Sequence, residues 1–318
     1  MRVDRYLVTG GAGFIGSHIT GALLARGARV RVLDDFSSGR EANLDVRGAR
    51  DRLEIVRGDV ADAAACREAC EGVHGIFHEA AQVSVPRSIE DPERSHAINV
   101  MGTLRLLEAA RGAGVRRVVF AASSAAYGDT PSLPKVETMV PDPLSPYAAG
   151  KVAAEHLMRV YGSVHGMRTI SLRYFNVYGP RQADDSPYTG VIAIFARALL
   201  DGREPTIFGD GRQTRDFTYV DDVVDANLRA MEAEVAAGTV INVGSGESTS
   251  LLDLLRVMGA ILGRDPQPRF ASARAGDVRD SLASIARAES LLGWRPRTGL
   301  RAGLERTLAW YRERLART

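Results

Sequence analysis

The sequence is poor in lysine and in net charge. Of its 41 basic residues, only Lys135 and Lys151 are lysines, and the formal net charge is +2. No run of basic residues stands out, so the composition gives no reason to expect nucleic acid as a partner. The chain uses arginine at almost every basic position but lysine at position 151. This choice indicates that residue 151 has a role that arginine cannot fill. Lys135 lies in a proline-bounded loop, and it can be a lysine left by compositional drift without a functional reason.

Cysteines and long apolar runs are also scarce. Cys66 and Cys70 lie four residues apart on one predicted helix face, and no second Cys or His pair accompanies them, so we expect plain thiols rather than a metal site. No apolar run approaches the roughly 18 residues of a membrane span, and no signal-peptide core precedes Gly10. We therefore expect a cytoplasmic protein with no membrane partner.

A glycine-rich turn lies near the N-terminus. Residues 6–8 are apolar, and Gly10, Gly13 and Gly16 follow at intervals of three around a helical pattern that begins at Phe14. The first two glycines permit a sharp turn and close approach of a ligand, and the third permits tight packing of helix on strand. The helix N-terminus would then bind the pyrophosphate of a dinucleotide. The spacing alone also fits a plain glycine turn in any α/β protein.

An acidic residue ends the next predicted strand, RVRVLD over 29–34. Asp34 lies 24 residues after Gly10, where a ribose-binding carboxylate is expected. It would accept hydrogen bonds from the adenosine ribose and repel a 2′-phosphate, so we predict NAD rather than NADP. Arg40 nearby works against that choice. The loop between them, DFSSG, is placed to surround the adenosine.

The alternation of strand and helix continues. Asp59 and Val60 are placed to face the adenine, although a plain strand end is equally compatible with the sequence. Small residues at Ala80 and Ala81 let the backbone pass close to a cofactor. Asn99 is either the N-cap of a helix or a polar group that reaches the site. Periodicity predicts a helix over 99–112 and strands over 53–59, 76–81, 117–122 and 167–174.

A tyrosine and a lysine one helical turn apart form the second informative pattern. Pro146 suits a first helical turn and Ser145 its N-cap, which places Tyr147 and Lys151 on one helix face. A phenol with the ordinary pKa of about 10 is a weak base at pH 7, but a nearby ammonium and a positive nicotinamide ring favour the phenolate. Ser123, after a predicted strand, is placed to hold the substrate hydroxyl. The alternative is a helix with an unrelated exposed Tyr and Lys.

These segments together resemble the extended short-chain dehydrogenase/reductases, and among them the nucleotide-sugar 4-epimerases of the UDP-galactose 4-epimerase type. TGGAGFIGSH, SSAAYG, SPYAAGK and RYFNVYGP occur in the family's order, and RQTRDFTYVDD and RAGDVRDS follow in the second lobe. The resemblance implies an α/β fold: a Rossmann-type doubly wound parallel sheet over 1–178 and a smaller C-terminal α+β substrate lobe over 179–318. A segment near 213–246 is expected to return to the Rossmann domain.

The resemblance also implies the reaction, an NAD-dependent 4-epimerisation of UDP-hexoses: UDP-glucose and UDP-galactose, or UDP-GlcNAc and UDP-GalNAc. Ser123, Tyr147 and Lys151 would be the catalytic set. Tyr147 would take the proton of the sugar 4-hydroxyl while hydride moves to NAD, and the 4-ketosugar would turn over and receive hydride on its other face, so that NAD is recycled.

Two sets of binding residues follow. The predicted cofactor-binding residues are Gly10, Gly13, Phe14, Ile15, Gly16, Asp34, Asp35, Phe36, Ser37, Ser38, Gly39, Asp59, Val60, Ala80, Ala81, Gln82, Asn99, Tyr147, Lys151 and Tyr174. The predicted substrate-binding residues are Ser123, Ser124, Tyr147, Asn176, Val191, Ile192, Thr206, Phe208, Arg215, Arg274 and Asp277.

Three positions depart from family patterns. Ala125 stands where related dehydratases and decarboxylases carry an acidic residue, which disfavours dehydration. Ser281 stands where galactose epimerases often have a bulky tyrosine, so the pocket should admit an N-acetyl group. Arg181 is the one evident carboxylate clamp after Asn176, which leaves UDP-glucuronate open as a substrate.

Other functions also stay open. A dehydratase or a 4-ketosugar reductase would share the fold, and a non-catalytic NAD-binding sensor or scaffold would bind NAD without turnover. The intact set of Ser123, Tyr147 and Lys151 counts against the last. By the same resemblance, we expect the helices that begin at Asn99 and Tyr147 to pair with their copies in a homodimer.

Overall fold

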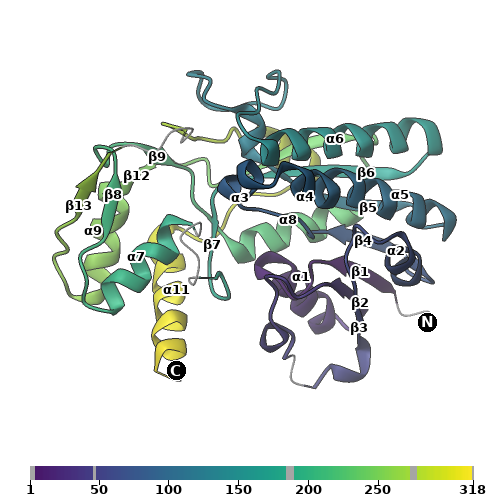
Figure 1. Cartoon of the computed structure of the whole chain (residues 1–318), viewed down its shortest axis with the longest axis horizontal. Helices are drawn as coiled ribbons and strands as arrows, with labels where there is room; N and C mark the ends of the chain where they lie inside the picture. Colours follow the sequence, from purple (N-terminus) through teal and green to yellow (C-terminus); the bar gives the residue numbers. More distant parts are fainter. Residues whose placement is uncertain (1–3, 46–47, 184–189, 273–277, 317–318) are drawn as a thin grey trace.

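A parallel sheet forms the centre of the computed structural model (Figure 1). The structure describes residues 4–45, 48–183, 190–272 and 278–316. Within these ranges, seven parallel strands stand in the order β11-β6-β5-β4-β1-β2-β3, which confirms the predicted Rossmann-type doubly wound sheet. The strands are β1 (Arg5–Thr9), β2 (Arg29–Asp34), β3 (Leu53–Arg57), β4 (Gly75–His78), β5 (Arg117–Ser123), β6 (Arg168–Tyr174) and β11 (Thr239–Val243).

Helices cover both faces of the sheet. Consecutive strand residues point to opposite faces, so Val8 and Val119 lie in one core while Leu7 and Val118 lie in the other. This double burial is why the strands read as nearly continuous apolar runs. The first core contains α1 (Phe14–Ala25), α8 (Val220–Glu232) and α10 (Ala286–Leu292), and the second contains α2 (Ala63–Cys70), α5 (Thr103–Gly112) and α6 (Pro146–His165).

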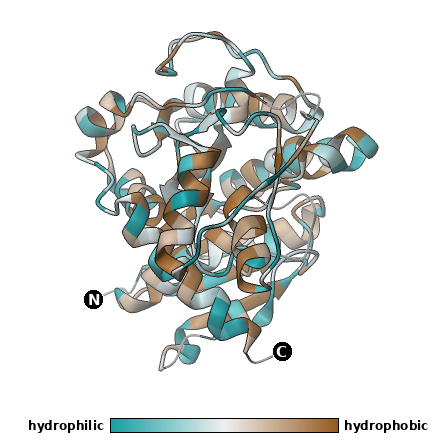
Figure 2. Cartoon of the chain, turned by 90° about the vertical axis from the view of Figure 1, so that its left-hand side faces the viewer, coloured by the Kyte–Doolittle hydropathy of each residue, from teal (hydrophilic) through white to brown (hydrophobic). Residues whose placement is uncertain are grey.

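Apolar and polar residues alternate around the helices (Figure 2), as packing on a sheet requires. On α2, Cys66 and Cys70 are free and turned inward, and burial raises the pKa of their thiols to about 11 and about 12. Plain buried thiols therefore match the expectation for this pair. No helix within the described ranges has both the length and the apolar character needed to span a membrane.

Two strands end earlier than predicted. β3 stops at Arg57 rather than at 59, because the chain turns where the Ala61 N–H donates to Asp59 Oδ1 at 2.8 Å. β4 stops at His78 rather than at 81, because the Ala80 N–H donates to Thr9 Oγ1 at 3.2 Å and leaves the ladder. Both changes place the residues after the strand at the rim of the sheet.

The helix predicted from Asn99 begins further upstream. Short helices α3 (Val85–Glu90) and α4 (Pro92–His96) run into a π-helix (Ala97–Gly102) that continues as α5. Asn99 therefore lies inside helical structure, and the N-cap alternative for it is wrong. Asp91 caps α4 instead, accepting from the Arg94 N–H at 2.9 Å.

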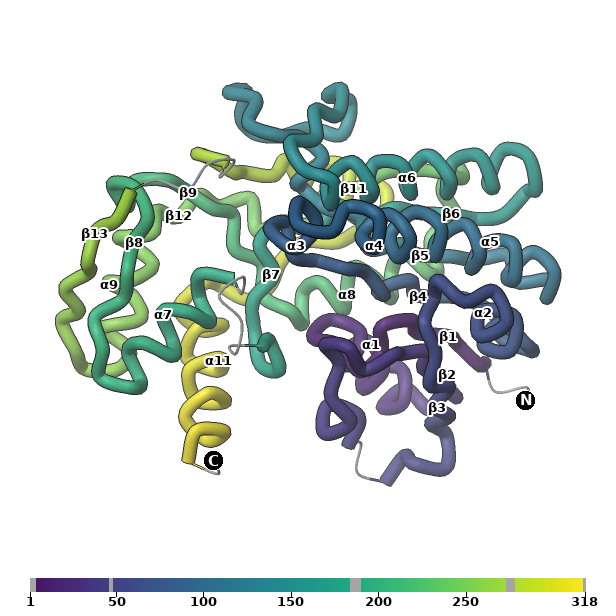
Figure 3. Tube along the Cα trace, viewed as in Figure 1, coloured from purple at the N-terminus to yellow at the C-terminus, as the bar shows by residue number. Residues whose placement is uncertain are grey.

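The second lobe packs three helices around a separate apolar core. Phe195, Leu254 and Leu308 lie in this core, and Figure 3 shows α11 beside α7. Residues 191–200 form α7, and Ser250 caps α9, where Ser250 Oγ accepts from the Asp253 N–H at 3.0 Å. The helices are α7 (Val191–Leu200), α9 (Leu251–Leu262) and α11 (Leu300–Leu315).

Short strand pairs connect the two lobes and edge the second one. β7 (Val177–Tyr178) pairs with β10 (Thr218–Tyr219) between them. β8 (Thr206–Phe208) pairs with β13 (Arg269–Ala271), and β9 (Thr214–Arg215) with β12 (Thr249–Ser250). Short 3-10 turns occur at Glu41–Leu44, Arg50–Arg52 and Ser124–Tyr127.

Candidate active site

The glycine turn joins β1 to α1 without room for larger side chains. Gly10 has a φ of +65°, and a Cβ there would lie 2.7 Å from the Ala80 nitrogen. A Cβ on Gly16 would lie 2.2 Å from the Gly10 carbonyl oxygen, so helix and turn are in direct contact. The start of α1, at Phe14, therefore presents its N–H groups and the positive end of its dipole at the turn, which is a site for a pyrophosphate.

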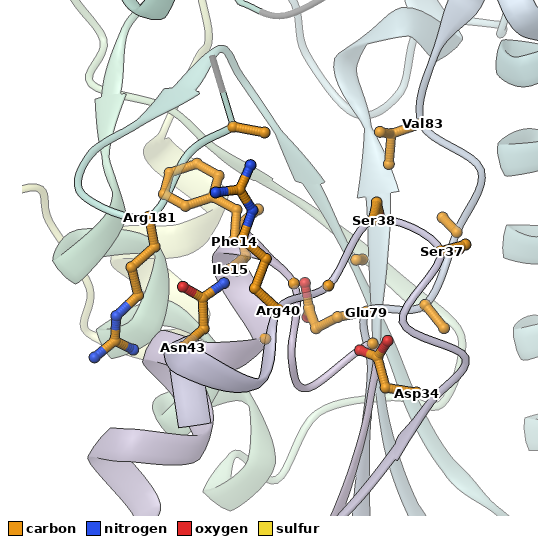
Figure 4. Close-up of a pocket in the computed structure, with 18 of the residues that line it drawn as sticks. Phe14, Ile15, Asp34, Ser37, Ser38, Arg40, Asn43, Glu79, Val83 and Arg181 are labelled. Carbon is orange, nitrogen blue, oxygen red and sulfur yellow. The ribbon is translucent and has the colours of Figure 1, made fainter. Parts of the chain in front are cut away.

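A groove with a volume of about 1250 Å³ runs over the carboxyl ends of the strands (Figure 4). It begins at the glycine turn, passes the end of β2 and the loop after β4, and reaches α6. All the predicted cofactor-binding residues line it except Asn99. The groove lies where the strand order reverses, which is where doubly wound sheets bind dinucleotides, and the turn, helix terminus and acidic strand end together fit NAD.

Asp34 is anchored at the rim of this groove. Its Oδ2 accepts from the Ala12 N–H and its Oδ1 from the Phe36 N–H, both at 2.8 Å. Burial raises the pKa of this carboxyl, while the two backbone donors oppose the change. The donors hold the carboxylate in one orientation at the end of β2, where it can receive the ribose hydroxyls. Arg40 also lines the groove, so both residues that bear on the choice of cofactor belong to its wall.

Asn99 supports the groove from behind. Its Oδ1 accepts from the Gln82 N–H at 2.9 Å, and its Nδ2 donates to the Gln82 carbonyl at 3.0 Å. The π-helix brings this side chain to the loop after β4, and Asn99 itself is buried. It therefore positions Gln82, which lines the groove, and does not line the groove itself.

A buried histidine on β4 links Thr9, just before the glycine turn, to Thr103 on α5. His78 Nδ1 accepts from Thr9 Oγ1 at 2.8 Å, and His78 Nε2 donates to Thr103 Oγ1 at 2.9 Å. The Thr103 hydroxyl donates to the Asn99 carbonyl at 2.7 Å, which assigns the proton of the imidazole to Nε2. Burial lowers the pKa of His78 to about 3, so the ring is neutral and acts as a structural link.

The predicted tyrosine and lysine both line the groove from α6. Ser145 caps this helix, with its Oγ 3.2 Å from the Ala148 nitrogen, as predicted. Lys151 Nζ donates to the Ala121 carbonyl at 2.7 Å and lies 4.8 Å from the Phe120 ring centroid. Ser123, at the end of β5, is near enough to the Tyr147 phenol to act on it and lowers its pKa. The structure thus brings the end of β5 and the start of α6 together as the sequence pattern predicts.

The electrostatics of this pair differ from the expectation. Burial raises the pKa of Tyr147, and the hydrogen bond from Ser123 opposes that change, so the protein alone does not favour the phenolate. Burial lowers the pKa of Lys151 to about 8, against the charges of Glu79 and Glu155. The physical reason is desolvation: α6 holds both side chains in a closed wall, where each neutral form is favoured.

Residues that the sequence pattern did not single out also line the groove. Trp310, Glu313 and Arg314 reach it from α11, which lies more than a hundred residues after α6 in the chain. Glu79 lines it from the loop after β4, next to Ala80. An acidic residue inside the apolar run GIFHEAA is a signal for Glu79, whereas the approach of α11 depends on tertiary packing alone.

The predicted substrate residues after β6 do not line this groove themselves, although Val177, next to Asn176, and Gly190, next to Val191, do. Asn176 Nδ2 donates to the Asp216 carbonyl at 3.2 Å and lies 3.5 Å from Ser281 Oγ. Arg215 donates to the Thr214 and Arg279 carbonyls at 2.8 and 3.0 Å. Ser123, Ser124, Val191, Ile192, Thr206 and Phe208 do not line the groove either. Arg274 and Asp277 lie outside the described residues.

Arg181 is turned toward the first lobe. Its Nη1 donates to the Ser17 carbonyl on α1 at 3.1 Å, and its backbone φ is +67°. Figure 4 shows its side chain extending beside Phe14, away from Glu79. In this orientation its guanidinium binds a carbonyl of α1 rather than a position beyond Asn176.

The chain matches known proteins over its whole length. The profile of the NAD dependent epimerase/dehydratase family matches residues 6–244. The UDP-glucose 4-epimerase of Mycolicibacterium smegmatis is 45% identical over 312 residues, which cover 98% of this chain and 99% of that protein. The crystal structure of UDP-glucose 4-epimerase from Thermus thermophilus in complex with NAD aligns with a TM-score of 0.88 and 39% identity, over 97% of this chain and 99% of that one.

A second solved structure is similar as well. UDP-N-acetylglucosamine 4-epimerase from Methanobrevibacter ruminantium, in complex with UDP-N-acetylmuramic acid, aligns with a TM-score of 0.94 and 36% identity over 99% of this chain and all of that one. The resemblance drawn from the glycine turn, the SSAAYG segment and the Tyr-Lys pair is thereby confirmed. The chain belongs to the NAD-dependent epimerase/dehydratase family of extended short-chain dehydrogenase/reductases.

Proposed function

We propose that the protein is an NAD-dependent 4-epimerase of UDP-hexoses. The observation that carries this proposal is the arrangement of Tyr147 and Lys151 in one wall of the dinucleotide groove, with Ser123 at the adjoining end of β5. Removal of a hydride from a sugar carbon needs a base for the hydroxyl proton beside the hydride acceptor, and this arrangement supplies the base. The similarity to UDP-sugar 4-epimerases supports the substrate class.

When bound, NAD supplies a ring that accepts a hydride from the sugar and returns it. Tyr147 takes the proton of the 4-hydroxyl as that hydride leaves and gives it back on the return. The Ser123 hydroxyl is placed to donate to the phenol oxygen of Tyr147 and to hold the 4-hydroxyl of the sugar in position. Lys151 stabilises the phenolate by its charge, since an ammonium and a cationic ring together offset the desolvation that raises the pKa of Tyr147.

Ala125 supports epimerisation over dehydration. It lies in the turn Ser124–Tyr127, where its N–H donates to Ser123 Oγ at 3.2 Å, and its methyl side chain offers no proton. Elimination of water from the sugar needs an acid at this rim of the site. A dehydratase is therefore the weaker interpretation.

The second lobe supports neutral hexoses, including N-acetyl forms. Ser281 places a small side chain 3.5 Å from Asn176 Nδ2, which leaves space that a bulky residue would fill. Arg181 lines the groove and donates to the Ser17 carbonyl through Nη1 alone, so its other donors leave UDP-glucuronate open as a substrate. We propose that the UDP moiety contacts the second-lobe residues of the predicted set: Asn176, Val191, Ile192, Thr206, Phe208, Arg215, Arg274 and Asp277.

The test is product analysis without added cofactor. The purified protein is incubated separately with UDP-glucose, UDP-N-acetylglucosamine and UDP-glucuronate, and products are identified by NMR and mass. We expect 4-epimers of unchanged mass from the first two. Tyr147→Phe should lose nearly all turnover while it still binds NAD, whereas Tyr161→Phe, on the same helix but outside the groove, should keep turnover. Loss of water, consumption of NADPH, or NAD binding without turnover would each reject the proposal.

We also propose a homodimer that pairs α5 and α6 with their copies. Val160 and Val164 lie one turn apart on α6 and are 48% and 67% exposed, and Met101, just before α5, is 41% exposed. These exposed apolar side chains lie on two adjacent helices that a second copy could cover. Light scattering should give twice the chain mass, and Val160→Glu with Val164→Glu should give a monomer. A monomeric wild type at working concentration would reject the proposal.

We further propose that the protein acts in the cytoplasm. The free thiols of Cys66 and Cys70 are compatible with a reducing compartment. Fractionation of cells that express the tagged chain would test the location, and recovery from the cell exterior would reject it.

A further inference from the structure

Glu79 is an ionisable residue in the wall of the groove, and the proposed reaction gives it no role. It follows β4, its N–H donates to the Thr9 carbonyl at 3.2 Å, and its side chain lines the groove (Figure 4). Its Oε1 accepts from the Tyr174 hydroxyl at 2.9 Å. A carboxyl in an enclosed wall beside a cofactor groove is an expensive feature to maintain unless its charge has a use.

The hydrogen bonds around Tyr174 are directed at this carboxyl. Asn227 Nδ2, from α8, donates to the Tyr174 oxygen at 2.7 Å and also to the Val223 carbonyl at 2.9 Å. The phenol oxygen thus receives a hydrogen bond from Asn227, and its own proton has two acceptors, Glu79 Oε1 at 2.9 Å and Asn227 Oδ1 at 3.0 Å, of which Glu79 is the nearer. Burial raises the pKa of Tyr174 well above its ordinary value, so this donor stays protonated and stabilises the ionised form of Glu79.

Lys151 has two carboxylates within electrostatic reach, and only one of them lacks a cationic partner. Glu155, one turn further along α6, binds the Arg173 guanidinium at 2.8 and 2.7 Å, and both side chains are buried. The charges of Glu155 and Arg173 cancel, so this pair as a whole has no net charge to act on Lys151. The hydrogen-bond partner of Glu79 is the neutral Tyr174, so the charge of Glu79 is the one that acts on the ammonium.

We propose that Glu79 is a positioning residue for catalysis, whose carboxylate keeps the Lys151 ammonium protonated in the groove next to the cationic ring of NAD. Burial lowers the pKa of Lys151 to about 8, and Glu79 is the first of the charges that oppose this change. Burial raises the pKa of Glu79 to about 7, against the Tyr174 hydrogen bond and the Lys151 charge. Each group thus favours the charged form of the other.

The direction in which Glu79 shifts the pKa of Lys151 follows from the groups around Lys151. A second cation in the groove drives the pKa of Lys151 further down, and a neutral lysine cannot stabilise the Tyr147 phenolate. The Glu79 carboxylate opposes that loss. The charges that act on Lys151 are those of Glu79 after β4 and Glu155 on α6, and Lys151 in turn acts on His78 on β4. Tyr147 lies one turn before Lys151 on α6. Of these groups His78 is neutral and Glu155 is paired with Arg173.

The scarcity of lysine makes the test direct. The full chain, loaded with NAD, is labelled with 13Cε-lysine, which gives signals from Lys135 and Lys151 alone. Lys135→Arg assigns them. The Cε shift of each signal is followed from pH 6 to pH 10 in the wild type, in Glu79→Gln, which keeps an acceptor for Tyr174 but has no charge, and in Glu79→Asp, which keeps the charge.

In Glu79→Gln we expect the titration midpoint of Lys151 to fall by about one pH unit, a tenfold loss of proton affinity. Glu79→Asp should restore most of the shift, and the Lys135 signal should be the same in all three proteins. The alkaline limb of the kcat/KM profile should move to lower pH in Glu79→Gln by a similar amount. An unchanged Lys151 midpoint in folded Glu79→Gln, or an equal shift at Lys135, would overturn the inference.

The inference rests on the proposed function only for the catalytic meaning of Lys151. If no UDP-sugar is turned over by the wild type, the proposed function fails, while the Lys151 midpoints still decide whether Glu79 controls its charge. If epimerisation is found and the midpoints do not differ, the proposed function stands and the role of Glu79 is rejected.

Discussion

The side-chain amide of Asn99 binds the backbone of Gln82 at both its N–H, at 2.9 Å, and its carbonyl, at 3.0 Å. This contact fixes the loop that forms one wall of the groove. We predict that Asn99→Ala weakens NAD binding by about 30-fold, because two hydrogen bonds with a net value of about 1 kcal/mol each are lost. Calorimetric titration of NAD measures the effect. Asn99→Asp, which keeps the acceptor, should lose less, and equal affinity in all three proteins would contradict the prediction.

Lys151 should not tolerate arginine, although the chain uses arginine almost everywhere else. Its Nζ donates to the buried Ala121 carbonyl at 2.7 Å, where a planar guanidinium does not fit the same space. We predict that Lys151→Arg lowers kcat/KM by at least about 100-fold, the range for loss of a group that assists proton transfer.

Lys135 provides the matched control for that substitution. Its side chain is as buried as that of Lys151, at 2% against 3% exposure, but it binds the Thr130 carbonyl and hydroxyl outside the groove. Lys135→Arg should lower thermal stability and leave kcat/KM per folded protein within about twofold. Similar activity losses in the two variants would mean that burial, rather than chemistry, selects lysine.

Acid should destabilise the fold through His78. Burial lowers the pKa of His78 to about 3 in the folded protein, below the unfolded value of about 6.5. Its contribution to stability is therefore complete above pH 6.5 and is lost as the pH falls toward 3. Between pH 7.5 and 5 the loss from this residue should be about 2 kcal/mol. Urea unfolding at both pH values measures it.

In His78→Gln the difference in the free energy of unfolding between pH 7.5 and pH 5 should be smaller by about 2 kcal/mol, although the variant is less stable at each pH. Burial also lowers the pKa of His18, so part of the pH dependence should remain. A full pH dependence in His78→Gln would assign the effect to other groups.

The buried pair of Glu155 and Arg173 should show strong coupling. The guanidinium donates to both carboxylate oxygens and lies 4.6 Å from the Tyr127 ring centroid. Arg173→Met leaves a buried carboxylate without a partner and should cost about 3–5 kcal/mol, while Arg173→Met with Glu155→Met should recover most of that loss. Urea unfolding of the two single variants and the double variant gives the coupling energy. Additive losses would show that the pair contributes no specific interaction.

The parts of the site that the sequence predicts are those set by local spacing. The positive φ of Gly10, the carboxylate of Asp34 at a strand end and the one-turn separation of Tyr147 and Lys151 follow from intervals of a few residues. Such intervals act through backbone geometry, which a pattern can represent. The fold class is predictable for the same reason, since apolar strand runs alternate with amphipathic helices.

The parts that the sequence does not predict depend on contacts across the chain. The hydrogen bond between Glu79 and Tyr174 joins residues 95 positions apart, and α11 reaches the groove from the far end of the chain. The role of Asn99 required the π-helix, which no local signal marks. The raised pKa of Tyr147 depends on how closely α6 is packed, and spacing along a helix carries no information about desolvation.

The position of β11 restricts how this protein can be made and divided. Residues 239–243 pair with β6, so the sheet gains its last strand only after three quarters of the chain has been synthesised. Until then, β6 is an open edge whose unpaired N–H and carbonyl groups can recruit another strand. A fragment that ends near residue 178 would carry this edge permanently and would be prone to aggregate, so the nucleotide-binding half of the molecule cannot be isolated by a single cut.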